Sequence, residues 1–173
     1  MGVTHPQVRP DPALGLLQLY DDALPYVYGY LLARCGGDTG LAEDLTAESF
    51  LAAVHAARTP EAPAPSVPWL IGVARHKLAD HWRRAERERR GLRLLDSEPA
   101  PVEDPWETVV DRIRAREVLG RLGAHHRAAL TLRYLDGLPV PEVARHLNRT
   151  LHATEALLVR ARAAFRQMYQ PDE

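Results

Sequence analysis

Glycine and proline clusters divide this sequence into blocks whose apolar residues recur at the spacing of an α-helix. No alternating apolar and polar run flanked by Asn-Gly or Asp-Gly indicates a β-hairpin, so the pattern predicts an all-α fold. Pro25 is expected to kink the first block or to start a new helix there. The glycine-rich segment at residues 36–40 lacks the Lys-Ser/Thr of a phosphate loop and is interpreted as a turn. The predicted helices span residues 13–35, 41–57, 66–90, 125–135, 140–147 and 151–168.

The apolar positions of each block predict the side that faces a core. In the helix over 41–57 they are Leu41, Leu45, Phe50, Leu51 and Val54. In the helix over 66–90 they are Val67, Leu70, Ile71, Ala74, Leu78 and Trp82. In the last helix they are Leu151, Thr154, Leu158, Ala161 and Phe165.

Two proline-bearing segments interrupt the helical blocks. Residues 58–68 contain four prolines, which disfavour a helix and predict an extended loop. Residues 92–105 are acidic and also contain proline, a composition typical of a linker. We therefore expect two small helical domains, residues 1–91 and residues 106–173, joined by a flexible linker.

The helix over residues 66–90 is basic on the side opposite its apolar stripe. Six arginines and two glutamates lie between residues 83 and 93, whereas the whole chain has a net charge of −1. The basic side is formed by His76, Asp80, Arg83, Arg87 and Arg90, with Lys77 and Arg84 beside it. Such a face can bind the phosphates of a nucleic acid. It can also be a solvated surface with ion pairs such as Glu86 to Arg90.

The C-terminal blocks have the spacing of a helix-turn-helix. Asn148 follows the short helix over 140–147 where a left-handed residue ends a helix, and asparagine tolerates that conformation. Thr150 can then cap the longer helix that follows. The same spacing occurs in helical hairpins that only pack, so reading DNA and plain packing both remain open at this point.

Few features indicate catalysis or a metal. The one cysteine, Cys35, lies in an apolar helical segment, where we expect it to pack. His76 and His81 are poorly spaced to share a metal, and the adjacent His125 and His126 should point in different directions. There is no nucleophile elbow, no paired carboxylates in an evident cleft and no dinucleotide loop. We expect a protein that is not an enzyme and that has no cofactor and no metal.

The sequence also bears on location. No stretch approaches the roughly 18 uninterrupted apolar residues of a membrane span. The N-terminus, MGVTHPQVRPDP, lacks the apolar core of a signal peptide. We expect a cytoplasmic protein with no membrane partner.

Two separate segments resemble the two modules of one family, the group IV (extracytoplasmic function) sigma factors of bacterial RNA polymerase. The first comprises LYDDALPYVYGYLLARCG, LAEDLTAESFLAAV and PWLIGVARHKLADHWRR, and is similar to the promoter-melting module, sigma-2. The second, LGRLGAHHRAALTLRYLDGLPVPEVARHLNRTLHATEALLVRARAAF, is similar to the −35-reading module, sigma-4. The resemblance implies a sigma factor that binds core RNA polymerase and promoter DNA, with an anti-sigma protein as its regulator.

For the first module, the resemblance implies contacts with core polymerase and with the −10 element. Asp44 and Glu48 would face the clamp helices of the largest polymerase subunit, with a solvated acidic side as the alternative. The −10 candidates come from one helix and the loop before it, where family members capture an unstacked base. They are Arg58, Ser66, Arg75, His76, Lys77, Asp80, Arg83, Arg84 and Arg87. Trp69 could stack on a base or anchor the helix in the core, and its register favours the core.

For the second module, the resemblance implies that the last helix inserts its N-terminal residues into the −35 major groove. The candidates are Arg149, Thr150, His152, Ala153, Glu155 and Ala156, with Arg160 on a phosphate. Many members have Lys-Ser-Arg where this chain has Glu155-Ala156-Leu157. Phosphate affinity should therefore fall and base preference should change, and Glu155 could accept a hydrogen bond from cytosine N4. Alternatively, Leu157 widens the apolar stripe and docks a protein.

Two other classes of function remain. A stand-alone helix-turn-helix regulator would bind specific DNA tightly without polymerase and with a steep salt dependence. A protein-interaction module with a retired DNA helix is supported only by Glu155 and Leu157.

Overall fold

The computed structural model describes residues 12–92 and 112–169, so the predictions for residues 93–111, including most of the linker, lie outside the described residues. All regular structure in the described part is helical, which confirms the all-α prediction. The elements are α1 (Pro12–Arg34), α2 (Thr39–Ala57), α3 (Val67–Leu92), α4 (Arg112–Arg121), α5 (Ala124–Leu130), the π-helical turn η1 (Thr131–Leu135), α6 (Val140–Leu147) and α7 (Leu151–Tyr169).

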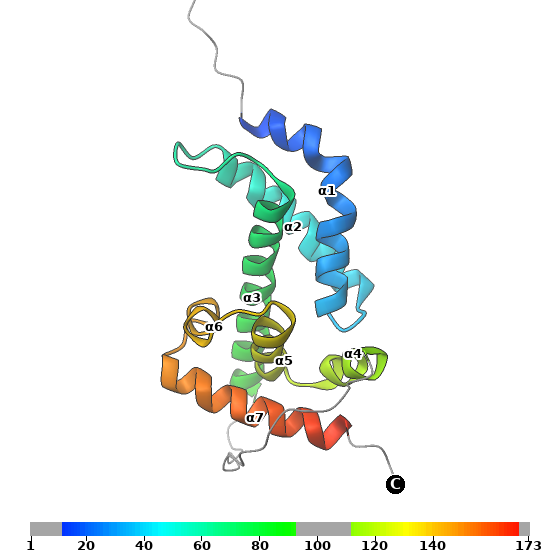
Figure 1. Cartoon of the computed structure of the whole chain (residues 1–173), viewed down its shortest axis with the longest axis vertical. Helices are drawn as coiled ribbons and strands as arrows, with labels where there is room; N and C mark the ends of the chain where they lie inside the picture. The colour runs from blue at the N-terminus through cyan, green and yellow to red at the C-terminus, as the bar shows by residue number, and fades with distance from the viewer. Residues whose placement is uncertain (1–11, 93–111, 170–173) are drawn as a thin grey trace, which may run out of the picture.

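Helices α1, α2 and α3 pack against one another as a first module (Figure 1). The side chains between them are large and apolar, and they are withdrawn from water almost completely. They are Val27 and Leu31 of α1, Leu45 of α2, and Leu70 and Leu78 of α3. The stripe predicted for α3 is therefore its buried side, and burial of each such side chain stabilises the fold by about 1.5–3 kcal/mol.

Helix α1 continues through Pro25, so of the two outcomes expected there, the start of a second helix does not occur. One detail of α2 differs from the sequence prediction. Leu51 was predicted to face the core but is 64% exposed. The buried line of α2 is made mainly of small residues such as Ala42, Ser49 and Ala53, which let α2 approach its neighbours closely. Large apolar residues were therefore a poor guide to the buried side of this helix.

The glycine-rich segment is a turn, as predicted. Gly36 and Gly37 have φ angles of +71° and +86°, a backbone conformation that favours glycine. The Asp38 carboxylate then accepts a hydrogen bond of 2.9 Å from the backbone N–H of Leu41, which caps α2.

The second module is built from α4 to α7. The helix predicted over 125–135 is α5 followed by η1, in which the backbone N–H of Asp136 donates to the carbonyl of Thr131 at 3.0 Å. Gly137, at φ +67°, then turns the chain into α6. The π-helical turn places Asp136 at the end of the element, where its side chain points away from the module's own core.

The helix-turn-helix follows the predicted geometry at its turn. Asn148 has φ 53° and ψ 49°, the left-handed conformation expected for it. The Thr150 hydroxyl oxygen accepts a hydrogen bond of 3.2 Å from the backbone N–H of Ala153, so Thr150 caps α7. Leu151, predicted to face the core, is 48% exposed, whereas Leu157 is completely buried. The other four residues predicted to face the core from this helix are buried, and Leu157 joins them.

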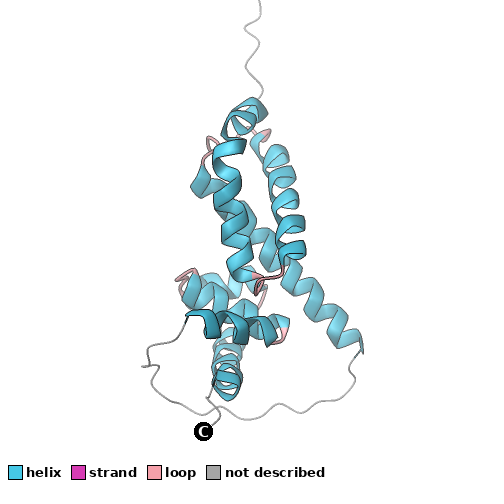
Figure 2. Cartoon of the chain, turned by 90° about the vertical axis from the view of Figure 1, so that its right-hand side faces the viewer, coloured by secondary structure: helices cyan, strands magenta, loops and turns pink. Residues whose placement is uncertain are grey.

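Helix α3 also packs against α5 and α6, so the two modules are in contact (Figures 1 and 2). Trp82, near the C-terminal end of α3, is only 2% exposed. It belongs to one continuous apolar cluster with Leu78 of α3 and with Ala128, Leu147 and Leu157 of the second module. The sequence indicated the apolar stripe but did not indicate that its far end is covered by the second module.

The turn after α1 makes a second, very close contact between the modules. A Cβ atom added at Gly36 would lie 2.7 Å from the Cα of Gly120 in α4, closer than real Cβ atoms approach backbone. A Cβ added at Gly37 would meet nothing within 4 Å. Both positions carry a positive φ, so an added side chain would strain the backbone at either one. Only at Gly36 would the side chain also clash with the α4 backbone.

This pair provides a matched test of the module contact. We expect Gly37→Ala to cost about 1–2 kcal/mol through backbone strain alone. Gly36→Ala should cost a further 1–3 kcal/mol, roughly, because the α4 backbone must move away. The measurement is the free energy of unfolding of both variants in urea. Equal destabilisation by the two substitutions would show that Gly36 and α4 are not in contact.

Candidate nucleic-acid interface

The basic side of α3 faces the second module over its middle turns. The Arg83 guanidinium donates through Nη1 to the backbone carbonyl of His146, at the end of α6, with a distance of 2.7 Å. The imidazole rings of His76 and His146 lie against each other with centroids 4.6 Å apart. Arg83 also pairs with Asp80 one turn earlier in α3. The middle of the predicted −10 face therefore contacts α6, although His76 remains exposed there.

Further along α3 the basic side is more open and partly paired within itself. Arg87 and Arg90 are exposed, and Arg90 Nε donates to Glu86 Oε1 at 3.0 Å, which confirms the predicted ion pair. The other Glu86 oxygen lies 2.7 Å from Nδ1 of His125 in α5. Glu86 thus connects the two modules while it neutralises part of the arginine charge.

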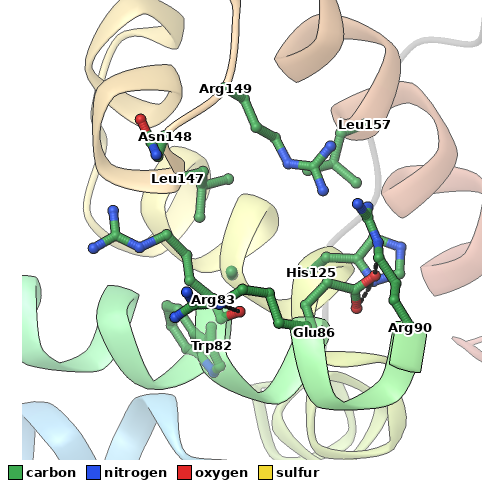
Figure 3. A pocket seen from close by; sticks show the side chains of 11 residues that line it. Trp82, Arg83, Glu86, Arg90, His125, Leu147, Asn148, Arg149 and Leu157 are labelled. Atoms are coloured by element: carbon green, nitrogen blue, oxygen red, sulfur yellow. Dashed lines mark hydrogen bonds and ion pairs between the residues drawn. The ribbon is translucent and has the colours of Figure 1, made fainter. Parts of the chain in front are cut away.

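A cleft of about 480 Å³ lies between this part of α3 and the helix-turn-helix (Figure 3). Its floor is apolar, with Trp82, Leu147 and Leu157 among the residues that line it. Its walls carry the guanidinium groups of Arg83, Arg87, Arg90 and Arg149. Figure 3 shows that Arg149, a predicted −35 contact, extends along this cleft from the turn between α6 and α7.

A buried ion cluster, formed by α1, α3 and the turn before α6, also joins the modules. The Asp136 side chain is only 1% exposed. Its Oδ1 accepts hydrogen bonds from Arg34 Nε at 2.9 Å and from Arg34 Nη2 at 2.6 Å. Its Oδ2 accepts a hydrogen bond of 2.9 Å from the Tyr30 hydroxyl, and Arg75 Nε lies 3.4 Å from it. Sequence reasoning named Arg75 but missed Tyr30 and Arg34, and it interpreted Asp136 only as part of a turn.

The pKa values of the histidines at the module contact are lowered, which favours their neutral forms. Burial, the nearby His76 ring and the positive charge of Arg75 together lower the pKa of His146 to about 4. Burial also lowers the pKa of His76. His146 Nδ1 is buried without a hydrogen-bond partner, so a proton there would have no acceptor. The rings of His125 and His126 lie 4.2 Å apart between centroids, which corrects the expectation that they point in different directions.

The remaining −10 candidates lie at the end of α2, just before α3 and elsewhere on α3. Arg84 is exposed, and Lys77 Nζ lies 3.8 Å from Glu48 of α2. Arg58 is exposed at the C-terminal end of α2. Ser66 caps α3, because its hydroxyl oxygen accepts from the backbone N–H of Trp69 at 3.4 Å.

Trp69 is partly buried and packs against the core cluster. This packing agrees with the structural role favoured by its register. Within the described residues, the −10 candidates on the middle turns of α3 therefore contact the second module, whereas Arg58, Arg84 and Arg87 are exposed.

The −35 candidates lie on the outer side of the second module. Thr150, His152 and Glu155 are exposed, and the other four are partly exposed: Arg149, Ala153, Ala156 and Arg160. Leu157 is completely buried beneath them. The leucine therefore packs in the core of the contact with α3 and is not available to dock a partner, which removes the alternative suggested for it.

The acidic candidates and a nearby groove lie on α2. Asp44 is exposed, whereas Glu48 is turned toward Lys77 of α3. A groove of about 820 Å³ runs between α1 and α2, and its lining includes the exposed Leu17 and Leu51. Sequence reasoning missed this groove, although an apolar residue such as Leu17 on the outer side of α1 was a signal for it.

Comparison with known proteins finds matches for both modules. A family model described as sigma-70 region 2 matches residues 19–88, and one described as sigma-70 region 4 matches residues 112–165. This chain belongs to the sigma-70 family. Its relatives place it in the extracytoplasmic function (ECF) group, so the resemblance of the two segments is confirmed.

Two relatives illustrate the ECF assignment. The ECF sigma factor BldN of Streptomyces coelicolor is 33% identical over 150 residues, which are 83% of this chain and 56% of BldN. This chain therefore spans little more than half of that relative. The ECF sigma factor SigL of Mycobacterium tuberculosis is 31% identical over 134 residues, which are 75% of each chain.

A solved structure supports the fold. The sigma factor RpoE of Bartonella quintana, crystallised in complex with the anti-sigma factor NepR, matches with a TM-score of 0.55 at 18% identity. The match covers 91% of this chain and 98% of that chain. In the part of this ECF chain that the structure describes, no helix is long and apolar enough to cross a bilayer.

The neutral histidines predict that acid weakens the folded ECF factor. His146 has a folded pKa of about 4 against an ordinary value of 6.5, so the unfolded chain binds more protons between these values. The stability contributed by neutral His146 is complete above about pH 6.5 and is lost as the pH falls toward about 4. The check is the urea midpoint across this range in the wild type and in His146→Gln.

The variant has no proton to gain at this position, so its midpoint should fall less steeply with acid. A variant with the same slope as the wild type would contradict the assignment of this dependence to His146.

Proposed function

We propose that this ECF sigma factor binds core RNA polymerase and directs it to promoters whose −10 and −35 elements are bound by the first and second modules. The observation that carries the proposal is that one chain holds both modules, each with a polar or basic helix face. Two DNA contacts on separate modules reinforce each other when a scaffold holds both in register, and polymerase would be that scaffold. RNA synthesis belongs to the polymerase, so no catalytic residue is assigned, and the place of action is the cytoplasm.

The −10 contacts are assigned to α3 and to the loop before it. Lys77, Arg84 and Arg87 would contact the phosphate backbone, and the segment from Arg58 to Ser66 would shape the wall of a pocket for an unstacked base. Arg75, His76 and Arg83 contact the second module in this structure, and Asp80 pairs with Arg83. Their role in promoter binding requires α6 to move away from α3.

The −35 contacts are assigned to the exposed start of α7. His152 and Glu155 lie on its outer side, where side chains can reach base edges in a major groove. The acid at Glu155 favours an exposed amino donor such as cytosine N4, and Arg160 is placed on a phosphate. The buried Leu157 supports the helix from behind.

We assign two protein partners. Asp44 is exposed on α2 and is placed on the clamp helices of the largest polymerase subunit, with Glu48 beside it. An anti-sigma protein is proposed as the regulator, because the RpoE of Bartonella quintana was solved in complex with its anti-sigma factor NepR.

Transcription with purified core polymerase tests the proposal. Added to core enzyme, the protein should yield transcripts from a subset of promoters of its own genome, and it should bind those promoters weakly when alone. Failure to produce a promoter-dependent transcript from any promoter of its genome would overturn the proposal. Tight sequence-specific binding without polymerase would identify a stand-alone regulator instead.

The polymerase contact gives a separate prediction. Asp44→Arg should weaken core binding by about tenfold or more, because it places a like charge opposite a basic partner surface. Glu61→Arg is the matched control, since Glu61 is an exposed acid in the loop after α2. Affinity for fluorescently labelled core enzyme is the measurement. An equal loss in both variants would attribute the effect to net charge rather than to a contact at Asp44.

The −35 assignment predicts different effects for two residues of α7. Arg160→Ala should weaken promoter binding by the polymerase complex to a similar extent for all −35 sequences and lower the salt slope by about one. Glu155→Ala should instead change which base is preferred at one −35 position, by about 1–3 kcal/mol. Binding to a library of promoters randomised at −35 separates the two effects. An unchanged base preference in Glu155→Ala would remove Glu155 from the reading set.

A further inference from the structure

The Asp136 carboxylate occupies a cationic site that belongs to the other module. Tyr30 and Arg34 come from α1 and Arg75 from α3, whereas Asp136 comes from the turn between η1 and α6. The carboxylate is almost completely buried and accepts three hydrogen bonds from Tyr30 and Arg34. Arg75 Nε is buried and 3.4 Å away, but it has no hydrogen-bond partner. The site therefore holds two guanidinium groups against one carboxylate.

The site is assembled by the first module itself. The Arg34 guanidinium stacks over the Tyr30 ring with its carbon 3.8 Å from the ring centroid. Arg34 Nη1 also donates to the backbone carbonyl of Tyr30 at 3.1 Å. Burial and the nearby Asp136 charge raise the pKa of Tyr30 well above its usual range, so its hydroxyl keeps its proton and donates. These local contacts remain when Asp136 leaves, so the site is preorganised to bind an anion.

A phosphodiester matches what Asp136 offers. It carries one negative charge on two unprotonated oxygens, as a carboxylate does, and arginine guanidinium groups bind both in the same forked geometry. Arg75 lies on the α3 face assigned to promoter DNA, and Arg34 extends that face onto α1. The same face makes two more contacts with α6, the hydrogen bond from Arg83 to His146 and the tilted ring contact between His76 and His146.

We propose that Tyr30, Arg34 and Arg75 form a binding site for a phosphate of promoter DNA, and that Asp136 is an internal substitute for this phosphate in the closed molecule. The chain alone binds DNA weakly because only the fraction of molecules in which Asp136 has left the site is competent. The inference rests on the proposed function, since it deepens the account of how the −10 face meets DNA. It adds Tyr30 and Arg34 to that face and assigns Asp136 the role of holding it closed.

The first experiment measures DNA binding by the full chain without polymerase. The probe is a short fluorescein-labelled DNA duplex with a central single-stranded bubble, followed by anisotropy. Asp136→Asn should bind about tenfold more tightly than the wild type, because it removes the charge that competes with phosphate. Glu142→Gln is the matched control, since it removes one negative charge from the same module. Glu142 pairs only weakly, at 3.8 Å, with Arg145 of its own helix.

The second experiment separates a phosphate site from a simple latch. Arg34→Gln is introduced into Asp136→Asn, where no internal carboxylate is left for Arg34 to hold. If Arg34 contacts a DNA phosphate, the double variant should bind more weakly than Asp136→Asn and its salt slope should fall by about one. If Arg34 serves only to hold Asp136, the two proteins should bind alike, and this result would overturn the phosphate site.

Compactness and folding are measured on the same proteins. Asp136→Asn should have a larger radius of gyration by small-angle X-ray scattering and an unchanged helix content by circular dichroism. If Asp136→Asn loses helix content, Asp136→Ser decides, because it removes the same charge with a smaller side chain, leaves the donors of the phosphate site intact and should likewise raise DNA affinity. DNA binding equal to the wild type by the Asp136 variant that keeps its helix content, or an equal gain in Glu142→Gln, would overturn the inference.

Transcription assays keep the two proposals apart. A wild-type chain that supports promoter-dependent transcription while Asp136→Asn gains no DNA affinity would reject only the internal substitute. A chain that supports no transcription in any variant would reject the proposed function itself.

Discussion

The structure depends on α3, because this one helix packs into the apolar interior of both modules. The N-terminal part of α3 places Leu70, Ala74 and Leu78 between α1 and α2, and its later turns carry Trp82 into the contact with α5, α6 and α7. A tryptophan buries a large apolar area, and leaving it in water would cost several kcal/mol of the small net stability of a domain. The same helix carries the basic face on its other side. The packing that stabilises the molecule therefore also decides which part of that face meets solvent.

The electrostatics of the contact follow from this arrangement. Guanidinium groups that approach a protein surface lose water, and the loss must be offset by hydrogen bonds or by an opposite charge. The second module supplies both, with the Asp136 carboxylate at Arg34 and Arg75 and with the His146 carbonyl at Arg83. A polyanion supplies the same chemistry. Contacts inside the molecule and contacts with DNA therefore compete for the same donors, and release of one set favours the other.

Much of the local structure could be predicted from residue types. Gly36 and Gly37 have the positive φ angles of a turn, Asn148 is left-handed, and Thr150 caps α7, because each choice is fixed by backbone sterics within a few residues. The errors occurred where neighbours decide burial. Leu51 and Leu151 fit an apolar stripe but are exposed, because small residues make the buried side of α2 and because Leu151 lies at the very start of α7. Most of the predicted −10 residues lie on α3, but three of them, Arg75, His76 and Arg83, contact the second module.

The sequence by itself determined the helical blocks, the turns between them and the membership of both modules in one family, because periodicity and turn chemistry are local properties of the chain. Only the tertiary structure decided that Tyr30, Arg34 and Arg75 meet Asp136. These residues are separated by 61 to 106 positions, and ion pairs across such distances leave no periodic signal. Only the tertiary structure showed, too, that Leu157 and Trp82 share one core. Contacts of this kind arise from the shape of two packed surfaces, which residue spacing along one chain does not encode.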